Sequence, residues 1–433
     1  MEIQRNLYLN RLKSYLWNGQ VKVITGVRRC GKSYLLNPLF RNFLLSEGTP
    51  EDHILSLELD KLKDLRFRNP LELASYVRSA VADHAERYYL FIDEIQLSDT
   101  VPNPYNPDGK PVTFYDALSD LMSLKNLDIY VTGSNSKMLS SDILTEFRDR
   151  GVELRMHPLT FSEYYSAVGG DKEDAFDEYA FYGGMPLVLS RPDEAAKMSY
   201  LQGLFNEVYL RDIIERKKIA RPEILSSIVD FLSSSIGSLT NATNITNAIN
   251  TKQKLSGEHQ VSNHTVSSYI NHLEDAFLFH ECKRYDVRGK SYFDYPSKFY
   301  CEDVGLRNAR IGFRQQEMTH IMENIIYNEL IARGCMVDVG VVFENTRNEN
   351  GNMVRAAREI DFVATFGGKK TYIQSAYAMS TEDKIKAELK PFSITGDAFP
   401  KVVVRRDVRK RWYDDNGVLN IGIIDFLLSG DIL

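Results

Sequence analysis

The sequence predicts an α/β protein in which a parallel sheet with helices on both faces is followed by a mainly helical region and a second α/β domain. Near the N-terminus, a short apolar strand, a glycine-rich loop and a helix follow one another. Apolar strands then alternate with amphipathic helical segments up to about residue 165, which is typical of a parallel sheet. A further α/β pattern begins near residue 296, and several domains are expected for 433 residues.

Short apolar runs mark the candidate strands of the first region. They are Lys22–Thr25, His53–Leu59, Tyr88–Asp93, Ile129–Thr132 and Val152–Met156. Residues 102–111 are rich in proline, asparagine and glycine, and such a segment forms neither a helix nor a central strand. We interpret it as a surface insertion, which is either an interaction loop or a tolerated addition.

The loop after the first strand carries the pattern G-x-x-x-x-G-K-S between Gly26 and Ser33. Glycines let successive backbone N–H groups turn toward one anion, and the N-terminus of the helix predicted at Ser33–Phe43 adds positive potential. We expect Lys32 to reach the β- and γ-phosphates of a nucleotide and the Ser33 hydroxyl to hold Mg²⁺. The candidate nucleotide contacts are Gly26, Val27, Arg28, Arg29, Cys30, Gly31, Lys32, Ser33 and Tyr34.

The apolar strand predicted at Tyr88–Ile92 runs directly into two acidic residues, Asp93 and Glu94. In a parallel sheet, this order places both carboxylates at the edge where the phosphate-binding loop lies. Asp93 is expected to bind the Mg²⁺ shell. Glu94 is expected to orient and polarise the attacking water as a general base. The pair therefore predicts nucleotide hydrolysis.

Two further groups are candidates for sensing or stabilising the γ-phosphate. Ser134 and Asn135 follow the fourth strand, where either side chain would lie between the γ-phosphate and the water; the alternative is an ordinary turn. Arg148 and Arg150 follow a predicted helix. An arginine there would stabilise transition-state charge in cis or across a subunit contact, or else form an ordinary surface salt bridge.

Composition and charge narrow the class of protein. A hydrophobic content of 43% and a charged content of 26% fit a soluble globular protein. The formal charge of −6 gives no global electrostatic argument for nucleic-acid binding and leaves only a local patch. Neither the four cysteines nor the eight histidines have metal-ligand spacing, which argues against structural zinc. Cys30 lies inside the glycine-rich loop, where a disulfide would be disruptive, and this favours a reducing cytoplasm. No run approaches the ~18 apolar residues of a membrane helix.

The region from about residue 170 to 285 is mainly helical and contains a winged-helix-like unit. Its predicted elements are the helix pair Ile245–Ile249 and Val261–Glu274 and the wing strands Phe277–Tyr285 and Ser291–Tyr295. His264 and Asn271 occupy exposed positions of the second helix, from which side chains read DNA bases in such units. The alternative is a wing that packs against protein.

The final region predicts a helix at Met318–Arg333 and several strands. The strands are Met336–Val342, Glu359–Thr365, Lys370–Ala376 and Lys401–Arg405. The segment Lys401–Trp412 carries six basic residues. It is either a phosphate-binding segment with a tryptophan for base stacking or a strand followed by a solvated basic loop.

Taken together, these motifs resemble the prokaryotic AAA-type ATPases (AAA-14-like) that have a phosphate-binding loop of the form G-x-R-R-x-G-K-S. The resemblance extends from end to end and rests on Thr25–Ser33, Phe91–Gln96, Thr132–Ser136, Pro158–Tyr164, Tyr182–Pro186, Tyr300–Asn308, Glu323–Leu330 and Glu359–Val363. It implies ATP as the nucleotide and a P-loop ATPase core, a helical lid, a winged-helix-like segment and a C-terminal domain of unknown function (DUF4143-like) with a restriction-endonuclease-like fold. Phe147–Arg150 departs from the usual Arg-Gly-Arg, so which arginine, if either, acts in trans stays open.

The resemblance also identifies a degenerate nuclease site. Restriction-type nucleases hold Mg²⁺ with a helix glutamate, a strand aspartate and an acidic residue two positions before a lysine. Here Glu329 and Asp361 match the first two, but Gln374 is neutral and Ala376 replaces the lysine. We therefore expect a retained fold without DNA cleavage, because the group that stabilises charge is missing.

We expect four parts: an ATPase core over residues 1–165, a helical lid over 166–220, a winged-helix-like segment over 221–295 and a nuclease-like domain over 296–433. The predicted function is an ATP- and Mg²⁺-dependent switch or motor acting on an unidentified protein or DNA partner, with no membrane partner; a homo-oligomer is compatible with it. The alternatives are an ATP-gated, metal-dependent nuclease and a nucleotide-binding scaffold with negligible turnover.

Overall fold

Five parallel strands form the N-terminal sheet, in the order β2-β3-β4-β1-β5. The strands are β1 (Val21–Thr25), β2 (Ile54–Glu58), β3 (Tyr88–Asp93), β4 (Leu127–Thr132) and β5 (Gly151–Arg155). The helices are α1 (Asn6–Ser14), α2 (Lys32–Tyr34), α3 (Arg41–Ser46), α4 (Pro70–Ala80) and α5 (Phe114–Leu121). All five strands predicted from the sequence are present, and the fold class is confirmed.

The structure is a computed structural model that describes residues 3–83, 85–133, 150–257, 259–293, 296–314, 317–347, 352–379 and 381–430. The chain divides into two compact units. The first runs to Pro158 and includes Asp275–Phe277, and the second comprises Leu159–Glu274 and the residues from Leu278 onwards. Within the described ranges, no helix is both long enough and apolar enough to cross a membrane.

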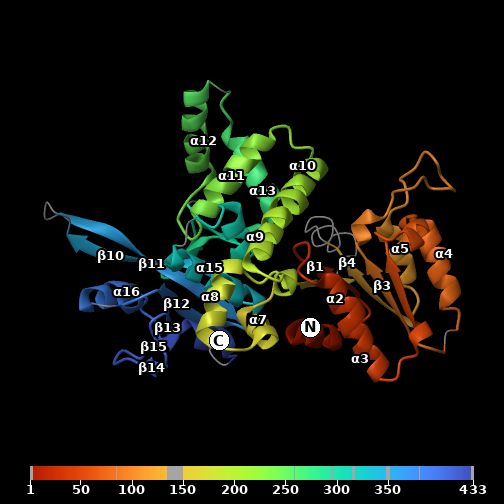
Figure 1. Cartoon of the computed structure of the whole chain (residues 1–433), viewed down its shortest axis with the longest axis horizontal. Helices are drawn as coiled ribbons and strands as arrows, with labels where there is room; N and C mark the ends of the chain where they lie inside the picture. Colours follow the sequence, from red (N-terminus) through yellow and green to blue (C-terminus); the bar gives the residue numbers. More distant parts are fainter. Residues whose placement is uncertain are drawn as a thin grey trace. The chain divides into compact units, whose positions relative to one another are not determined.

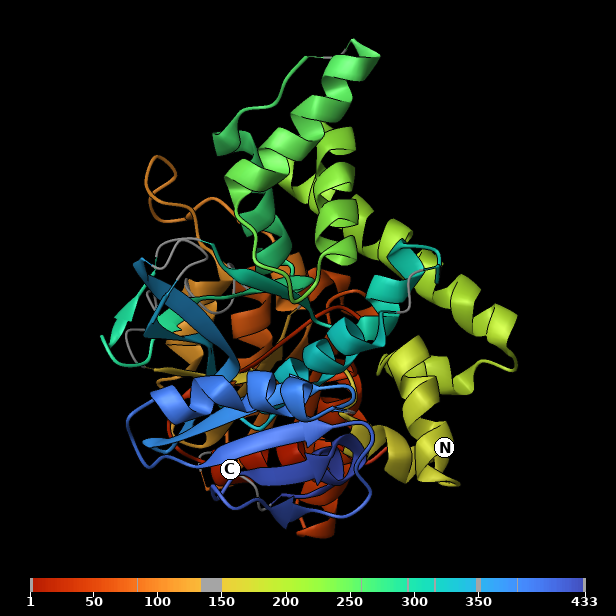
Figure 2. The ribbon, with the colours of Figure 1, turned by 90° about the vertical axis from the view of Figure 1, so that its left-hand side faces the viewer.

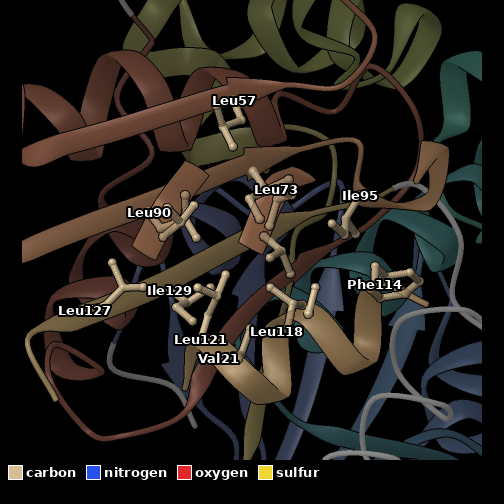
Figure 3. Close-up of a cluster of buried hydrophobic side chains, with 14 of the residues drawn as sticks. Val21, Leu57, Leu73, Leu90, Ile95, Phe114, Leu118, Leu121, Leu127 and Ile129 are labelled. Atoms are coloured by element: carbon tan, nitrogen blue, oxygen red, sulfur yellow. The ribbon is translucent and has the colours of Figure 1, made fainter. Parts of the chain in front are cut away.

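Helices cover both faces of the first sheet (Figure 1). On one face, Leu73 of α4 and Leu118 of α5 pack against strand residues such as Leu90, and Figure 3 shows this cluster. On the other face, Phe40 lies 5.8 Å from the Phe91 ring and 4.8 Å from the Tyr130 ring. Burial on both faces explains why the central strands β1, β3 and β4 are mainly apolar.

The helix after the glycine loop is longer than predicted. It runs from Lys32 to Ser46, because α2 continues through a π-helical turn, Leu35–Phe40, directly into α3. Pro38 lies inside that turn, where its missing backbone N–H removes one α-helical hydrogen bond. The predicted insertion at residues 102–111 forms neither helix nor strand. Its ends are joined by an antiparallel bridge between Val101 and Val112.

The helical part of the second unit includes α7 (Phe161–Val168), α8 (Lys172–Tyr182), α9 (Glu194–Gly203), α10 (Arg211–Lys217), α11 (Pro222–Ser234), α12 (Ala242–Ser256) and α13 (Asn263–Asp275). Helix α13 buries the apolar side predicted for it, and His264 and Asn271 are exposed as expected. The predicted strand Phe277–Tyr285 is divided in the structure. Its first part, β6 (Phe279–Cys282), pairs with β9 (Lys298–Cys301), and its second part joins a different sheet.

That different sheet has eight strands in the order β14-β15-β13-β12-β11-β10-β7-β8. The strands are β7 (Arg284–Asp286), β8 (Ser291–Tyr292), β10 (Met336–Arg347), β11 (Met353–Phe366), β12 (Lys369–Ala376), β13 (Lys401–Arg405), β14 (Trp412–Tyr413) and β15 (Leu419–Gly422). The C-terminal helices are α14 (Val304–Arg310), α15 (Met318–Ala332), α16 (Glu382–Ile394) and α17 (Ile423–Leu428). Figure 2 shows α16 lying across the strands, where Phe392 packs on Val363 and Tyr372.

Strands β10 and β11 are much longer than the sequence pattern indicates. They contain 12 and 14 residues and pair antiparallel along almost their whole length. Only the sections near Val341 and Phe362 are buried, and beyond them Phe343–Arg347 and Met353–Arg358 form a largely exposed two-stranded ribbon. The apolar pattern does not continue in the ribbon, because neither face contacts a core.

Candidate nucleotide-binding site

The phosphate-binding loop needs glycine at the position where strand β1 ends. Gly26 has φ +138, and a Cβ atom there would lie 2.1 Å from the Met156 carbonyl oxygen at the end of β5. Any side chain would therefore collide with backbone. Gly31, just before α2, has φ +105, which L side chains rarely adopt. Both glycines shape the loop by close approach and by left-handed backbone geometry.

A buried arginine braces this loop. The Arg5 guanidinium, 2% exposed, donates from Nη1 to the Cys30 carbonyl at 3.1 Å and from Nη2 to the His157 carbonyl at 2.7 Å. The Cys30 thiol faces the Met156 carbonyl at 3.6 Å. The loop is thus tied to the N-terminal segment and to the end of β5, so its backbone is held in place before any nucleotide binds.

Lys32 is folded back onto its own loop. Its Nζ donates to the carbonyl oxygens of Gly26 and Val27, both at 3.0 Å, and the residue is 4% exposed. A bound anion would compete with these carbonyls for the ammonium group, and the lysine would have to leave them to reach a phosphate. Tyr34, the last candidate contact, accepts a hydrogen bond from the Ile3 N–H at 3.3 Å.

Ser33 and Asp93 meet at the carboxyl edge of the sheet. The Ser33 hydroxyl donates to Asp93 Oδ1 at 3.0 Å, and the Thr132 hydroxyl from β4 donates to the same oxygen. Burial raises the pKa of the Asp93 carboxyl, and the hydrogen bonds from Thr132 and Ser33 oppose that rise. A hydroxyl and a carboxylate are hard oxygen ligands, which suit Mg²⁺.

Glu94 is held by its neighbours in an unusual backbone conformation. Its φ of +55 is left-handed, and its N–H donates to the Thr132 hydroxyl at 3.1 Å. The Gln96 side-chain amide donates to the Glu94 carboxylate. Thr132 therefore links the two acids, and Gln96 fixes the direction of the second. Neither residue was assigned a role from the sequence, although both belong to the segments that carry the family resemblance.

The predicted sensor and arginine residues are only partly described. Ser134, Asn135 and Arg148 lie outside the described residues. Arg150 is exposed and directly precedes β5, and its carbonyl accepts the Val21 N–H at 2.9 Å. It therefore lies at the amino edge of the sheet, one strand length of roughly 16 Å from the phosphate-binding loop. Arg150 is therefore too far from the loop to act within one chain, and a role across a subunit contact and an ordinary surface salt bridge both stay predictions.

The structure separates the three residues of the predicted degenerate nuclease site. Asp361 and Gln374 lie together: the Asp361 N–H donates to Gln374 Oε1 at 3.4 Å, and the Ser375 N–H donates to Asp361 Oδ2 at 2.8 Å. Glu329 instead pairs with Arg333 at 2.8 Å. Burial raises the pKa of the Glu329 carboxyl, and Arg333 opposes the rise.

A lysine and a second helix glutamate stand beside Asp361 instead. The Lys298 ammonium from β9 lies 2.8 Å from Glu323 of α15, 2.7 Å from Glu359 and 3.5 Å from Asp361. Burial by itself would lower the pKa of Lys298, but the three carboxylates raise it well above its usual range. The Tyr300 hydroxyl donates to Glu323 at 2.7 Å. We call Lys298, Glu323, Glu359 and Asp361 the lysine–carboxylate cluster.

A built-in cation thus fills the centre of the lysine–carboxylate cluster. In the described part of the chain, no group of three histidine, cysteine, aspartate or glutamate side chains is arranged to hold a metal ion. The sequence signals for Glu323 and Lys298 were weak, because Glu323 lies in the same helix as Glu329 and Lys298 belongs to no nuclease pattern.

Glycines in the segments Tyr182–Pro186 and Tyr300–Asn308 of the second unit lie in close contact with backbone atoms. A Cβ atom on Gly305 would lie 1.9 Å from the Tyr182 carbonyl, so the end of α8 and the start of α14 touch through backbone. Asp303 caps α14 and accepts the Gly184 N–H at 2.6 Å. Burial raises the pKa of the Asp303 carboxyl to about 6, against the hydrogen bonds that it accepts.

Family models match most of the chain outside the C-terminal sheet. Residues 18–165 match the model described as an AAA domain, and residues 173–317 match one described as a domain of unknown function (DUF8612). An uncharacterized protein of Haemophilus influenzae is 31% identical over 99% of this chain and 99% of its own length. An uncharacterized protein of Methanocaldococcus jannaschii is 26% identical, over 86% of this chain and 78% of its own.

Solved structures resemble the chain more distantly. The Walker-type ATPase of Pyrococcus abyssi gives a TM-score of 0.47 at 13% identity, over 72% of this chain and 96% of that chain. The Orc1 protein of Aeropyrum pernix, solved in complex with DNA, gives 0.28 at 15% identity, over 72% and 93%. At such low TM-scores, neither structure indicates what this chain binds.

Proposed function

We propose that this chain, which belongs to the family of its Haemophilus influenzae relative and carries an AAA domain, binds ATP with Mg²⁺ and hydrolyses it. The observation that carries the proposal is the 3.0 Å hydrogen bond from Ser33 to Asp93. It brings the hydroxyl at the end of the phosphate-binding loop next to the carboxylate at the end of β3, and these are the two groups that would hold a nucleotide-bound Mg²⁺. ATP rather than another nucleotide follows from the AAA family.

Each residue of the site has a proposed role. The backbone N–H groups from Gly26 to Ser33 cradle the phosphates. Lys32 exchanges its two loop carbonyls for the β- and γ-phosphates. Ser33 and Asp93 hold Mg²⁺, which neutralises charge on the phosphate oxygens when it is bound. Glu94 orients the attacking water and accepts its proton.

Two neighbours act through these residues. Thr132 positions Asp93 and Glu94 together, since its hydroxyl donates to one and accepts the backbone N–H of the other. Gln96 holds the Glu94 carboxylate and must yield or rotate for that carboxylate to take a proton. We propose that hydrolysis drives a switch or motor that acts on a partner through the second unit, for which the family resemblance implies a helical lid, a winged-helix-like segment and a nuclease-like domain.

A nucleotide-binding scaffold with negligible turnover is the second candidate. The hydrogen bond from Gln96 to the Glu94 carboxylate favours it, because that bond occupies the group that would take the water's proton. Binding and turnover must therefore be measured separately.

The test is phosphate release from ATP by the full chain, with binding of a fluorescent ATP analogue measured in parallel. Lys32→Ala should lose both binding and turnover. Glu94→Gln should bind normally and lose turnover by roughly 100-fold or more. The exposed residues Lys110 and Glu72 provide matched controls, as Lys110→Ala and Glu72→Gln. Equal turnover in wild type and both site variants would exclude hydrolysis at this site, and tight binding without turnover in wild type would establish the scaffold.

For the C-terminal sheet we propose a restriction-endonuclease-like fold without cleavage. The order α15, β10, β11, β12, α16, β13 and the pairing of Asp361 with Gln374 support the fold. The Lys298 ammonium among the carboxylates supports the loss of metal chemistry. Plasmid or single-stranded DNA cut with Mg²⁺ or Mn²⁺ by wild type, and not by Asp361→Ala, would instead establish a nuclease.

A further inference from the structure

We propose that the exposed β10–β11 ribbon and the turn between β7 and β8 form a binding surface for duplex DNA. The surface consists of five exposed cations, which we call the ribbon–turn cations: Lys283, Arg288, Lys290, Arg347 and Arg355. The inference rests on the proposed function, because it names the partner on which ATP hydrolysis would act. The binding of DNA itself does not require ATP hydrolysis.

The two parts of the surface are joined by backbone pairing. Strand β7 pairs parallel with β10, and the Val287 N–H donates to the Val341 carbonyl at 3.0 Å. Figure 2 shows the short β7–β8 hairpin beside the ribbon. Arg288 from the turn and Phe343 and Arg355 from the ribbon line one hollow of about 500 Å³. Its lining also includes two acids, Asp286 and Glu344, and Glu344 is paired with Arg358 and Lys390. Cations from both parts therefore face the same space.

This surface is basic in a chain that is acidic overall. Residues 283–293 contain four basic side chains and one acidic side chain, whereas the whole chain has 53 basic and 59 acidic residues. The single acid, Asp286, is 9% exposed. It accepts the Arg288 N–H at 3.1 Å and the Gly289 N–H at 2.8 Å, so its carboxylate is used inside the turn. The local positive charge is thus left for a partner.

Three other arginines of the second unit are neutralised by acidic side chains, whereas Arg409 and Lys410 are exposed. Arg405 pairs with Asp407 at 2.8 Å, and Arg406 pairs with Asp177 at 2.9 Å, which removes the two arginines at the start of the basic C-terminal segment. Arg211 pairs with Glu215 at 2.8 Å. In contrast, none of the ribbon–turn cations forms a salt bridge within the ranges that the structure describes. Unpaired, exposed cations are the groups that bind phosphates.

Two aromatic rings beside the ribbon–turn cations favour duplex over single-stranded nucleic acid, although Tyr292 of β8 is 60% exposed. Arg355 lies 3.9 Å over the Phe343 ring, and Arg284 lies 5.2 Å over the Phe293 ring. Single-strand binding relies on open aromatic faces on which bases stack, and here guanidinium groups cover these faces. The donor edges of a stacked guanidinium still point outward and can contact phosphate oxygens.

The ribbon also has the shape for a groove. Met353–Arg358 is exposed or half-exposed at every position. Six extended residues span roughly 20 Å. The major groove of B-DNA, about 12 Å wide, admits a two-stranded ribbon of this kind. Phosphate contacts by the turn and the ribbon would fix the protein on the duplex without reading its sequence.

The experiment is fluorescence anisotropy of the full chain, without nucleotide, on a labelled duplex of about 30 base pairs at several salt concentrations. The two test variants are Arg288→Glu/Lys290→Glu in the turn and Arg347→Glu/Arg355→Glu in the ribbon. The matched control is Arg409→Glu/Lys410→Glu, an equal charge change at exposed residues of the basic C-terminal segment. Each test variant should weaken binding roughly tenfold or more and lower the salt slope by about two. The control should change affinity less than about twofold.

Arg288→Gln/Lys290→Gln adds no negative charge and should also weaken DNA binding. Thermal melting curves of every variant, compared with wild type, test whether the substitutions unfold the protein. Failure of the wild type to bind the duplex at low salt would overturn the proposal. An equal loss in the control would overturn it as well, as would tighter binding of the single strand of the same sequence. Because ATP hydrolysis is measured without DNA, its loss in Lys32→Ala and the loss of DNA binding are separate results.

Discussion

Replacing Lys298 with methionine removes an ammonium group from the centre of three carboxylates while leaving a side chain of similar length. Lys298 is 5% exposed as a side chain, Glu323 8% and Asp361 10%, so water does not replace the lost charge. The variant tests whether the lysine–carboxylate cluster depends on its built-in cation. It leaves the nucleotide site untouched, because the cluster belongs to the second unit.

The magnitude follows from the distances. Two carboxylates lie 2.7 and 2.8 Å from the ammonium, and each contact is worth about 6 kcal/mol at an effective dielectric constant of about 20. Desolvation of the buried groups offsets most of this attraction. Removing one partner from such a group costs about 3–5 kcal/mol, since it leaves uncompensated buried charge. We therefore expect the unfolding free energy of the second unit to fall by that amount near pH 8.

The loss should shrink at low pH. Burial and Glu323 raise the pKa of the Asp361 carboxyl, and Lys298 opposes that rise. Without Lys298 the pKa of Asp361 rises further, so the penalty of the buried negative charge is full above that pKa and is relieved as protons bind below it. At pH 5 we expect the loss to be smaller than at pH 8 by at least about 1 kcal/mol.

The assay uses the two tryptophans of the chain. Trp17 lies in the first unit and Trp412 in the second, so a Trp17→Phe background leaves Trp412 to report urea unfolding of the unit that holds the cluster. Lys410→Met, at an exposed position, is the control and should change stability by less than about 0.5 kcal/mol. Adding Asp361→Asn to Lys298→Met should recover part of the loss. A loss below about 1 kcal/mol at pH 8, or one that is equal at both pH values, would refute the reasoning.

Three further predictions concern other contacts. Thr132→Val removes the hydroxyl that hydrogen-bonds both Asp93 and the Glu94 N–H, so ATP turnover should fall by up to about 100-fold while nucleotide binding stays nearly unchanged. Parallel measurements of turnover and binding check this, and unchanged turnover would contradict it. Gly26→Ala should abolish nucleotide binding, since its Cβ would lie 2.1 Å from a backbone oxygen; wild-type affinity by titration of a fluorescent ATP analogue would count against that contact. Because the folded-state pKa of Asp303 is raised from 3.8 to about 6, wild-type stability should decline by up to about 3 kcal/mol as pH rises through this range. In Asp303→Asn, pH-dependent urea melts should show a flatter profile, and an unchanged slope would argue against Asp303 as its source.

The sequence predicted the first sheet and its loop well, because the relevant signals are local. The central strands β1, β3 and β4 are buried at every position and are therefore mainly apolar, and Gly26–Ser33 specifies its own turn. The carboxyl ends of parallel strands share one edge, so the meeting of Ser33 with Asp93 follows from strand order alone. Thr132 could have been added by the same argument, since it ends the neighbouring strand.

The long-range contacts were beyond the reach of local patterns. Glu323 and Glu329 lie on one helix six residues apart, which points them about 120° away from each other. Only the packing of α15 against the sheet decides which glutamate meets Asp361. The alternating apolar pattern of a strand ends where its burial ends, so the exposed ribbon beyond Val342 left no apolar signal. The predicted strand Phe277–Tyr285 is divided between two sheets, and that division depends on which strands lie nearby.

The α/β class, the glycine-rich loop and the acidic end of β3 follow from the sequence alone, because backbone geometry and strand direction fix these features within short segments. Only the packing of distant segments places Lys298 at the centre of the carboxylates and Arg150 at the far edge from the loop. The same packing leaves the five ribbon–turn cations without a salt bridge among the residues that the structure describes. Charges act through space, and their partners are set by how distant segments pack, not by their order along the chain.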